Sequence, residues 1–187
     1  GERELLWGVD RLDFVRRRFG IAPRIGGRRA GSASGSAAPP RAIELFFDYA
    51  SPYAYLASTQ LRGLIERAGV TLTLTPILLG ALFRNLGTPN VPLFAMSDAK
   101  RAYQGEELSR WSRRWHVPLK FPSRFPMNTV KALRGTLLIP EAKRLEAMER
   151  VFTAYWVHDR DIGDDTVLSE LFDPLSEKDV RDLIGFL

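Results

Sequence analysis

Ser51 carries a hydroxyl at the point where an apolar strand is expected to pass into a helix. The strand-like run 43–48 (IELFFD) leads through Tyr49 and Ala50 to Ser51 and Pro52. Ser is a preferred helix N-cap, and Pro is favoured at the first helical position because its φ is already helical. The free backbone N–H groups and the dipole at such a helix end stabilise negative charge. A thiolate bound beside Ser51 would be favoured, although a purely structural N-cap explains the same spacing.

The positions from Ser51 to Ala54 read Ser-Pro-Tyr-Ala, where a thioredoxin-like βαβ unit normally presents Cys-x-x-Cys. The chain contains no cysteine. Disulfide exchange by the protein itself and metal binding through thiolates are therefore both excluded. Any thiol chemistry at Ser51 must use a thiol that a bound molecule supplies.

Length and composition indicate one globular domain with a substantial core. The chain has 187 residues, of which 45% are hydrophobic, and a domain of this size buries enough apolar surface to be stable. Its formal charge is +5, with 22 Arg against only 5 Lys. We interpret this bias as a coding preference and expect no nucleic-acid partner.

The sequence shows no signal for a membrane protein. Its most apolar stretch, 72–83, is too short to cross a bilayer and is interrupted by Pro76 and Gly80. The first residues, GERE, lack the basic region and apolar core of a secretory signal. We therefore expect a cytoplasmic protein without a membrane partner.

The periodicity predicts a βαβ unit over residues 42–80. Strand 43–48 is followed by a helix over 52–68 that ends before Gly69, and by a second strand over 70–74 in which apolar residues alternate with Thr. A strand, a crossover helix and a strand in this order indicate a right-handed parallel unit.

Residues 1–19 are predicted to hold a short strand over 4–7 and a helix capped by Asp10. From residue 20 to 41 the composition changes to Gly, Ser, Ala, Pro and Arg, which is typical of a flexible linker.

Residues 81–187 are predicted to form a helical insertion. Aromatic and apolar stripes with a 3.6-residue period predict helices over 97–116 and 141–158. Asp164 and Ser176 are expected to cap two further short helices.

The chain contains, in this order, the segments 46–57 (FFDYASPYAYLA), 76–84 (PILLGALFR), 121–129 (FPSRFPMNT), and 154–157 (AYWV) with 161–162. These four segments resemble successive segments of the 2-hydroxychromene-2-carboxylate isomerases and their kappa-class glutathione transferase relatives. The resemblance covers residues 43–187 almost continuously. It implies an α/β fold, a thioredoxin-like (DsbA-like) sheet with a large all-helical insertion.

The ends of the chain depart from that family in their order. Residues 4–19 resemble the family's last strand and helix, which should follow the helical region. A helix and a strand preceded by a cis-proline are expected between residues 187 and 4 and are not found. The resemblance therefore implies a permuted chain, a rearranged gene product or a window across two tandem domains.

The resemblance implies a glutathione site in which the Ser51 hydroxyl hydrogen-bonds the cofactor sulfur and serves as the catalytic group. The thiolate would add reversibly to a ring-opened aromatic substrate, allow rotation about the former double bond, and leave. No net oxidation occurs, which agrees with a site that has no cysteine.

Further site residues are implied by matching positions. The segment Trp7, Gly8, Val9 and Asp10 matches the family's glutathione-contacting turn, with Asp10 placed to receive the glutamyl ammonium group.

The substrate-binding positions implied by the resemblance are Arg84, Asn90 and Phe125. Arg84 would pair with a substrate carboxylate, because a planar guanidinium suits that group. Without the resemblance, Arg84 would be a solvated arginine and Phe125 a core aromatic. The two histidines, His116 and His158, are far apart and lack nearby acids, so we expect no metal site.

We therefore expect a glutathione-dependent cis-trans isomerase that acts on a small aromatic substrate. The first alternative is a kappa-like glutathione transferase, which would consume glutathione.

The second alternative is a non-catalytic fragment or binding module, because the expected loss of a strand would leave an open sheet edge. Exchange of residues 4–19 between two chains through the linker would then produce a homodimer, which we expect. The weakest alternative is association of the arginine-bearing linker with anions or nucleic acid.

Overall fold

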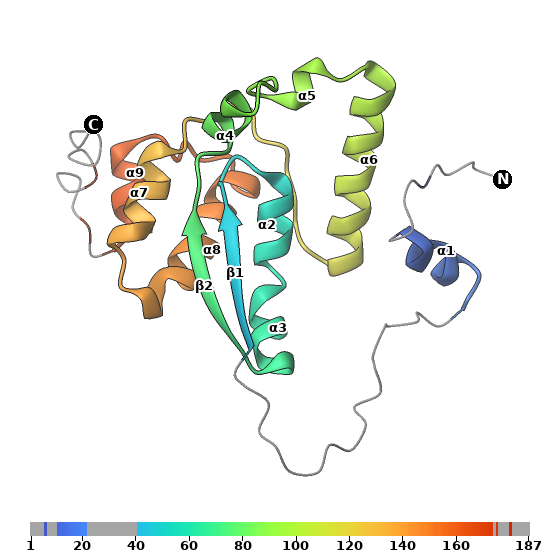
Figure 1. Cartoon of the computed structure of the whole chain (residues 1–187), viewed down its shortest axis with the longest axis horizontal. Coiled ribbons are helices and arrows are strands. Elements are labelled where there is room, and N and C mark those ends of the chain that lie inside the picture. The colour runs from blue at the N-terminus through green and yellow to red at the C-terminus, as the bar shows by residue number, and fades with distance from the viewer. Residues whose placement is uncertain (1–5, 7–10, 22–40, 174, 176–179, 181–187) are drawn as a thin grey trace, which may run out of the picture. The chain divides into compact units, whose positions relative to one another are not determined.

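The computed structural model describes residues 6, 11–21, 41–173, 175 and 180 (Figure 1). The chain divides into two compact units, residues 1–39 and 40–187. In the first unit, helix α1 spans Leu12–Arg18 and follows Arg11 at the N-cap position. The helix expected here is confirmed. Of the strand expected over 4–7 only Leu6 is described, and Asp10, the expected cap of the helix, lies outside the described residues.

The second unit is built on two parallel strands, β1 (Arg41–Phe47) and β2 (Val70–Pro76). Their register pairs Arg41 with Val70 and Phe47 with Pro76. In β2 the valine and leucines face the core while Thr71 and Thr73 are exposed, as the alternation in the sequence predicts. The parallel βαβ unit expected over this region is confirmed.

The crossover between the strands is two helices, α2 (Pro52–Ser58) and α3 (Leu61–Ala68), and the prediction of one continuous helix was wrong. The Ser58 and Thr59 hydroxyls donate to the carbonyls of the residues three positions earlier, each over 2.7 Å. Such side-chain bonds compete with the helical backbone ladder and interrupt it. Gly69 ends α3 at φ 59°, in the left-handed region where glycine is favoured.

Every element described after β2 is a helix. Two of them confirm the long helices expected over 97–116 and 141–158, and α9 is capped by Asp164, whose carboxylate accepts the N–H groups of Thr166 and Val167. Ser176, expected to cap another helix, lies outside the described residues. The helices are α4 (Leu79–Asn85), α5 (Pro92–Ala95), α6 (Asp98–Trp115), α7 (Val130–Leu138), α8 (Glu141–Trp156) and α9 (Asp165–Leu171).

The core of this unit lies between one face of the sheet and helices α2, α7, α8 and α9. Helix α8 supplies its centre, because Met148, Phe152 and Trp156 are all completely buried. The Phe152 ring meets the Tyr49 ring edge-on at 4.8 Å between centroids. This packing joins the end of β1 to α8 and fixes the loop that carries Ser51.

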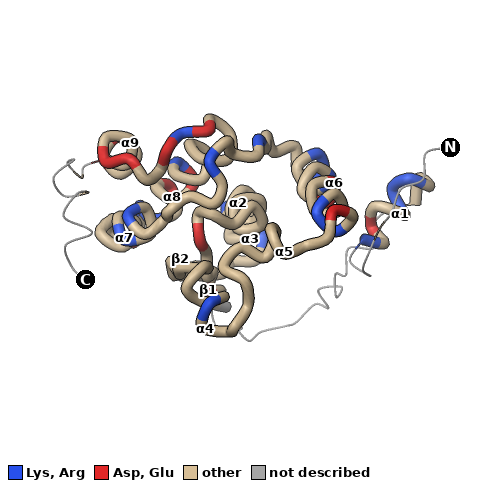
Figure 2. Tube along the Cα trace, turned by 90° about the horizontal axis from the view of Figure 1, so that it is seen from above, with Lys and Arg blue, Asp and Glu red and all other residues tan. Residues whose placement is uncertain are grey.

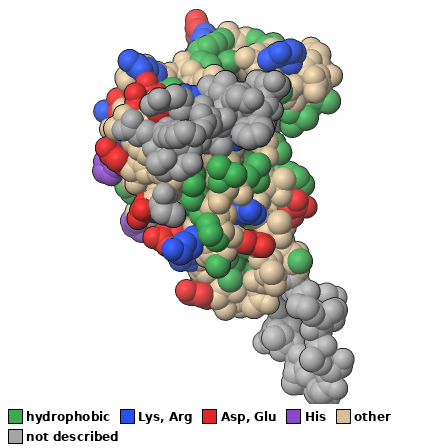
Figure 3. Space-filling model, turned by 90° about the vertical axis from the view of Figure 1, so that its left-hand side faces the viewer, with side chains coloured by type: hydrophobic (Ala, Val, Ile, Leu, Met, Phe, Trp, Pro, Cys, Tyr) green, Lys and Arg blue, Asp and Glu red, His purple; other side chains and the backbone are tan. Residues whose placement is uncertain are grey.

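The outer face of the sheet is less covered. Ala42, Glu44 and Phe46 are exposed along β1, and Phe46 keeps 56% of its surface in solvent. On the face shown in Figure 3, hydrophobic side chains are interspersed with acidic and basic ones. Among the described residues, no helix has both the length and the apolar character needed to span a bilayer.

Candidate functional site

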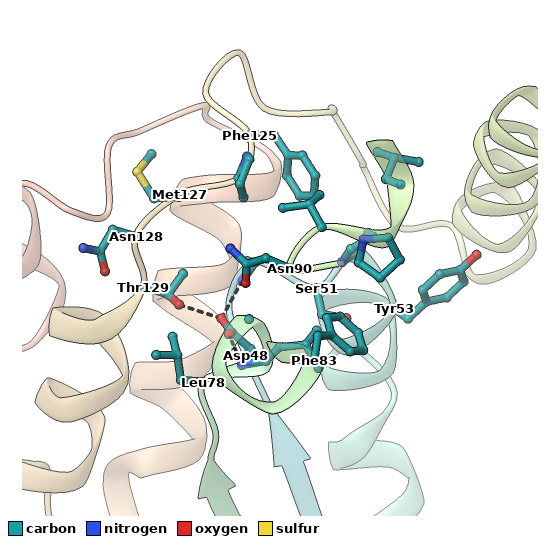
Figure 4. Close-up of a pocket in the computed structure, with 18 of the residues that line it drawn as sticks. Asp48, Ser51, Tyr53, Leu78, Phe83, Asn90, Phe125, Met127, Asn128 and Thr129 are labelled. Atoms are coloured by element: carbon teal, nitrogen blue, oxygen red, sulfur yellow. Dashed lines mark hydrogen bonds between the residues drawn. The ribbon is translucent and has the colours of Figure 1, made fainter. Parts of the chain in front are cut away.

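A cavity of about 570 Å³ opens where β1 and β2 end. Its walls come from the loop after β1, the first turn of α2, helix α4, the start of α5, and the segment 125–130 (Figure 4). The carboxyl ends of parallel strands are where α/β proteins commonly bind ligands. The volume lies within the range of about 300–1,000 Å³ that is usual for small-molecule sites.

Ser51 lies on the wall of this cavity as the N-cap of α2. Its Oγ accepts the Ala54 N–H over 3.2 Å, and its own N–H donates to the Asp48 carbonyl over 3.0 Å. The expected N-cap is confirmed. Because the capping bond uses only a lone pair of Oγ, the hydroxyl proton remains a donor for a bound group.

Asp48 forms the floor of the cavity and is only 3% exposed. Its carboxylate accepts three hydrogen bonds: from the Thr129 hydroxyl over 2.7 Å, the Leu79 N–H over 2.8 Å and the Ala50 N–H over 3.0 Å (Figure 4). A buried carboxylate needs such donors, because burial without them is costly. No role was predicted for Asp48 or Thr129 from the sequence. The available signal was an acidic residue directly at the end of an apolar strand.

Arg84 lines the cavity with an exposed side chain. It is the basic residue of α4, and Figure 2 shows the blue of Lys and Arg on this helix. Asn90, also a lining residue, lies against Gly80 so closely that a Cβ at Gly80 would overlap the Asn90 amide oxygen. The absence of a side chain at Gly80 therefore lets the Asn90 amide fold over the first turn of α4.

Aromatic rings form the opposite wall of the cavity. Phe125 is half-buried and lies 4.9 Å from Phe121 and 6.4 Å from Phe94 between ring centroids. Phe121 also lines the cavity and is 45% exposed, whereas Phe94, 59% exposed, packs beside Phe125 outside the lining. Pro126 follows Phe125 through a cis peptide bond and also lines the cavity. This wall offers flat apolar surface to a ring-containing ligand.

Buried tyrosines surround the site. Burial raises the pKa of Tyr49, whose hydroxyl pairs with Thr136 Oγ1 over 2.6 Å. Burial likewise raises the pKa of Tyr155, whose hydroxyl donates to the Arg124 carbonyl over 2.7 Å. These phenols stay protonated near neutral pH and serve as fixed hydrogen-bonding groups. At the cavity itself, the Tyr53 hydroxyl donates to the Gln104 side chain of α6.

The structure thus places Ser51, Arg84, Asn90 and Phe125, all of them site residues expected from the sequence, on one cavity. The expected glutathione-contacting turn of Trp7, Gly8, Val9 and Asp10 lies outside the described residues. Its place relative to Ser51 stays a prediction.

The fold and this cavity define a DsbA-like thioredoxin protein. The DsbA-like thioredoxin domain family matches residues 42–176, and the chain belongs to that family. The DsbA-like thioredoxin family and the fold class expected from the resemblance are both confirmed.

Among individual relatives, the chain is 33% identical over 121 residues to glutathione S-transferase kappa 1 of Caenorhabditis elegans, covering 62% of this chain and 52% of that protein. It is 29% identical over 120 residues to the 2-hydroxychromene-2-carboxylate isomerase of Pseudomonas putida, covering 61% and 55%. A solved 2-hydroxychromene-2-carboxylate isomerase shares the fold with a TM-score of 0.63 at 24% identity, covering 77% of this chain and 71% of the other. The chain spans about half the length of the curated relatives it matches.

Proposed function

We propose that the protein is a glutathione-dependent cis-trans isomerase of aromatic carboxylates of the 2-hydroxychromene-2-carboxylate type. The observation that carries the proposal is that Ser51, Arg84, Asn90 and Phe125 line one cavity. The relatives named as isomerases and kappa-class transferases support an enzyme of this kind.

The residues present fit glutathione as the source of the thiol. Ser51 offers a hydroxyl proton into a cavity of about 570 Å³, and the chain has no cysteine of its own. When bound, glutathione would supply a thiolate nucleophile that adds to the substrate and leaves unchanged. The Ser51 hydroxyl would donate a hydrogen bond to the sulfur and favour its charged form.

The other lining residues would bind and orient the substrate. Arg84 would pair with the carboxylate, and the Asn90 amide would hydrogen-bond an oxygen of the substrate. The aromatic ring would pack against Phe125 and exclude water from the reacting face. These three residues are held by α4, by the loop after it and by the 121–130 segment, whereas Ser51 is held between β1 and α2. The reacting double bond would lie between these two sets of residues.

A calorimetric titration with reduced glutathione tests the proposal. We expect saturable binding that Ser51→Ala weakens by about 10- to 100-fold, the usual effect of losing a hydrogen bond to a charged group. Ser97→Ala is the matched control, since Ser97 caps α6 by accepting the Lys100 N–H and does not line the cavity. Isomerase activity on 2-hydroxychromene-2-carboxylate should fall in parallel. Absence of glutathione binding by the folded wild-type chain would contradict the proposal and favour the binding-module alternative.

A kappa-like glutathione transferase is the second candidate, and the identity to the Caenorhabditis elegans protein favours it. The two reactions differ in the fate of the thiol. A transferase consumes one glutathione per turnover, whereas an isomerase returns it. Measuring free thiol during turnover separates them.

A further inference from the structure

Asp48 connects three segments that build different parts of the cavity. Its three hydrogen bonds come from the loop before Ser51, from the start of α4 and from the start of α7 (Figure 4). Along the chain these donors are separated by as many as 79 residues, from Ala50 to Thr129. One side chain therefore joins three segments that build different parts of the cavity.

Helix α4 depends on this carboxylate for the cap of its first turn. The N-cap residue is Leu78, whose apolar side chain forms no capping hydrogen bond. Leu79 is the first helical residue, and its N–H donates to Asp48 Oδ2 over 2.8 Å. The carboxylate thus satisfies a helix N-terminal donor from another segment, where negative charge is also favoured by the dipole. The helix so held carries Arg84.

At the start of helix α7, the side chain at the N-cap position bonds the same carboxylate instead of capping the helix. Thr129 occupies the N-cap position of α7, where threonine commonly caps, yet its side chain forms no capping bond. Its hydroxyl instead donates to Asp48 Oδ1 over 2.7 Å. The Val130 N–H is accepted by the Asn128 side chain over 3.1 Å. The Thr129 side chain therefore joins the 125–129 segment to the end of β1 rather than capping α7.

We propose that Asp48 is a positioning residue that holds the substrate-binding side of the cavity, namely α4 and the 125–129 segment, against Ser51. The proposal rests on the function proposed above. The Ser51 side has other attachments, because the Ser51 N–H donates to the Asp48 backbone carbonyl and Trp156 donates to the Tyr49 carbonyl. Loss of the carboxylate should therefore displace the substrate-binding side more than Ser51.

A matched pair of threonines distinguishes a positioning role of this hydrogen-bond network from a merely structural one. Thr129 is 1% exposed and its hydroxyl is hydrogen-bonded to Asp48. Thr136 is 0% exposed and its hydroxyl is hydrogen-bonded to Tyr49, the residue that follows Asp48. Both belong to the α7 region, but Thr136 does not line the cavity. Thr129→Val and Thr136→Val remove the same hydroxyl from equally buried sites. A structural role alone predicts equal effects on ligand binding.

The experiment measures binding of 2-naphthoate, as a flat aromatic anion, and of reduced glutathione to the full chain. We expect Thr129→Val to weaken naphthoate binding about tenfold, as loss of a hydrogen bond to a charged group would. Thr136→Val should change it less than about twofold, and Thr129→Ser should restore it. Asp48→Asn should weaken naphthoate binding more than glutathione binding, because an amide cannot accept from all three donors.

Equal losses in Thr129→Val and Thr136→Val, or unchanged naphthoate binding in folded Asp48→Asn, would overturn the proposal. Amide exchange gives a readout that does not depend on the proposed function. In Asp48→Asn the Leu79 N–H should exchange at least about tenfold faster than in Thr136→Val. If wild-type protein binds neither probe, the proposed function fails. Leu79 exchange then decides the positioning role, and unchanged exchange would refute it.

Discussion

The indole Nε1–H of Trp156 donates a hydrogen bond to the backbone carbonyl of Tyr49 over 2.9 Å. Trp156 is the last residue of α8 and completely buried, and Tyr49 lies two positions before Ser51. The C-terminal end of α8 is thereby attached to the loop that presents the candidate catalytic hydroxyl. Stability of the core and geometry of the site are coupled through this bond.

Replacing Trp156 by Phe should destabilise the protein by roughly 2–4 kcal/mol, because it leaves the buried Tyr49 carbonyl unpaired and reduces the packed volume. Urea unfolding measures the change. Trp115→Phe on α6 is the control, since Trp115 is only half-buried, and it should cost less. Equal costs for the two variants would show that the carbonyl bond contributes little.

Replacing either of two glycines by alanine should change the stability of the protein in opposite directions. A Cβ at Gly135 in α7 would lie 2.5 Å from a ring carbon of Phe172, which is fully buried and cannot move aside freely. Gly135→Ala should therefore destabilise by about 1–3 kcal/mol. Gly105 in α6 has nothing within 4 Å of that position, so Gly105→Ala should stabilise by about 0.5–1 kcal/mol. Thermal unfolding of both variants tests the pair, and a shift of the same sign in both would contradict the packing argument.

The ion pair between Arg62 of α3 and Glu149 of α8 should contribute little to stability despite its geometry. Arg62 donates through Nη2 over 2.6 Å and through Nε over 2.9 Å to the two carboxylate oxygens. The Arg62 side chain is 57% exposed, so solvent screens the pair. Arg62→Gln should lower the free energy of unfolding by less than about 1 kcal/mol. Repeating the comparison in 1 M salt should reduce the difference further, and a larger, salt-independent loss would argue against screening.

Asp159 should make stability depend on pH in the acid range. The Ser123 N–H and then Lys120 lower the pKa of this carboxyl below its ordinary value of 3.8. The unfolded chain therefore binds a proton at higher pH than the folded protein does. The stability that Asp159 contributes is complete at a pH above its ordinary pKa and is lost as pH falls through its lower pKa in the folded protein. Urea unfolding between pH 5 and about pH 2 should show a shallower acid loss for Asp159→Asn.

The elements that formed as expected are those whose signals are local. The parallel strands, the Ser51 and Asp164 caps and the end of α3 at Gly69 each follow from residues within a few positions of one another. The interruption between α2 and α3 was missed because the helix over 52–68 was predicted from the spacing of its apolar residues alone, without weighing Ser58 and Thr59. Their hydroxyls instead bond the backbone, and periodicity carries no information about that competition.

The site was found in part for a different reason. Ser51 stood out from its position at a strand-to-helix turn, and the candidate substrate-binding residues followed from resemblance to a family. Asp48 and Thr129 were quoted within the same segments without a role. Their importance comes from a hydrogen bond across 81 positions of sequence, which no local pattern reveals.

The sequence alone determined that the protein has a thioredoxin-like βαβ unit, a hydroxyl where a thiol usually lies, and no thiol of its own. These properties depend on backbone preferences and on residue identity, which act over a few positions. Only the tertiary structure decided that the C-terminal end of β1 and the starts of α4 and α7 meet at one carboxylate. That meeting depends on long-range burial, which brings together donors from segments that have no local preference for each other.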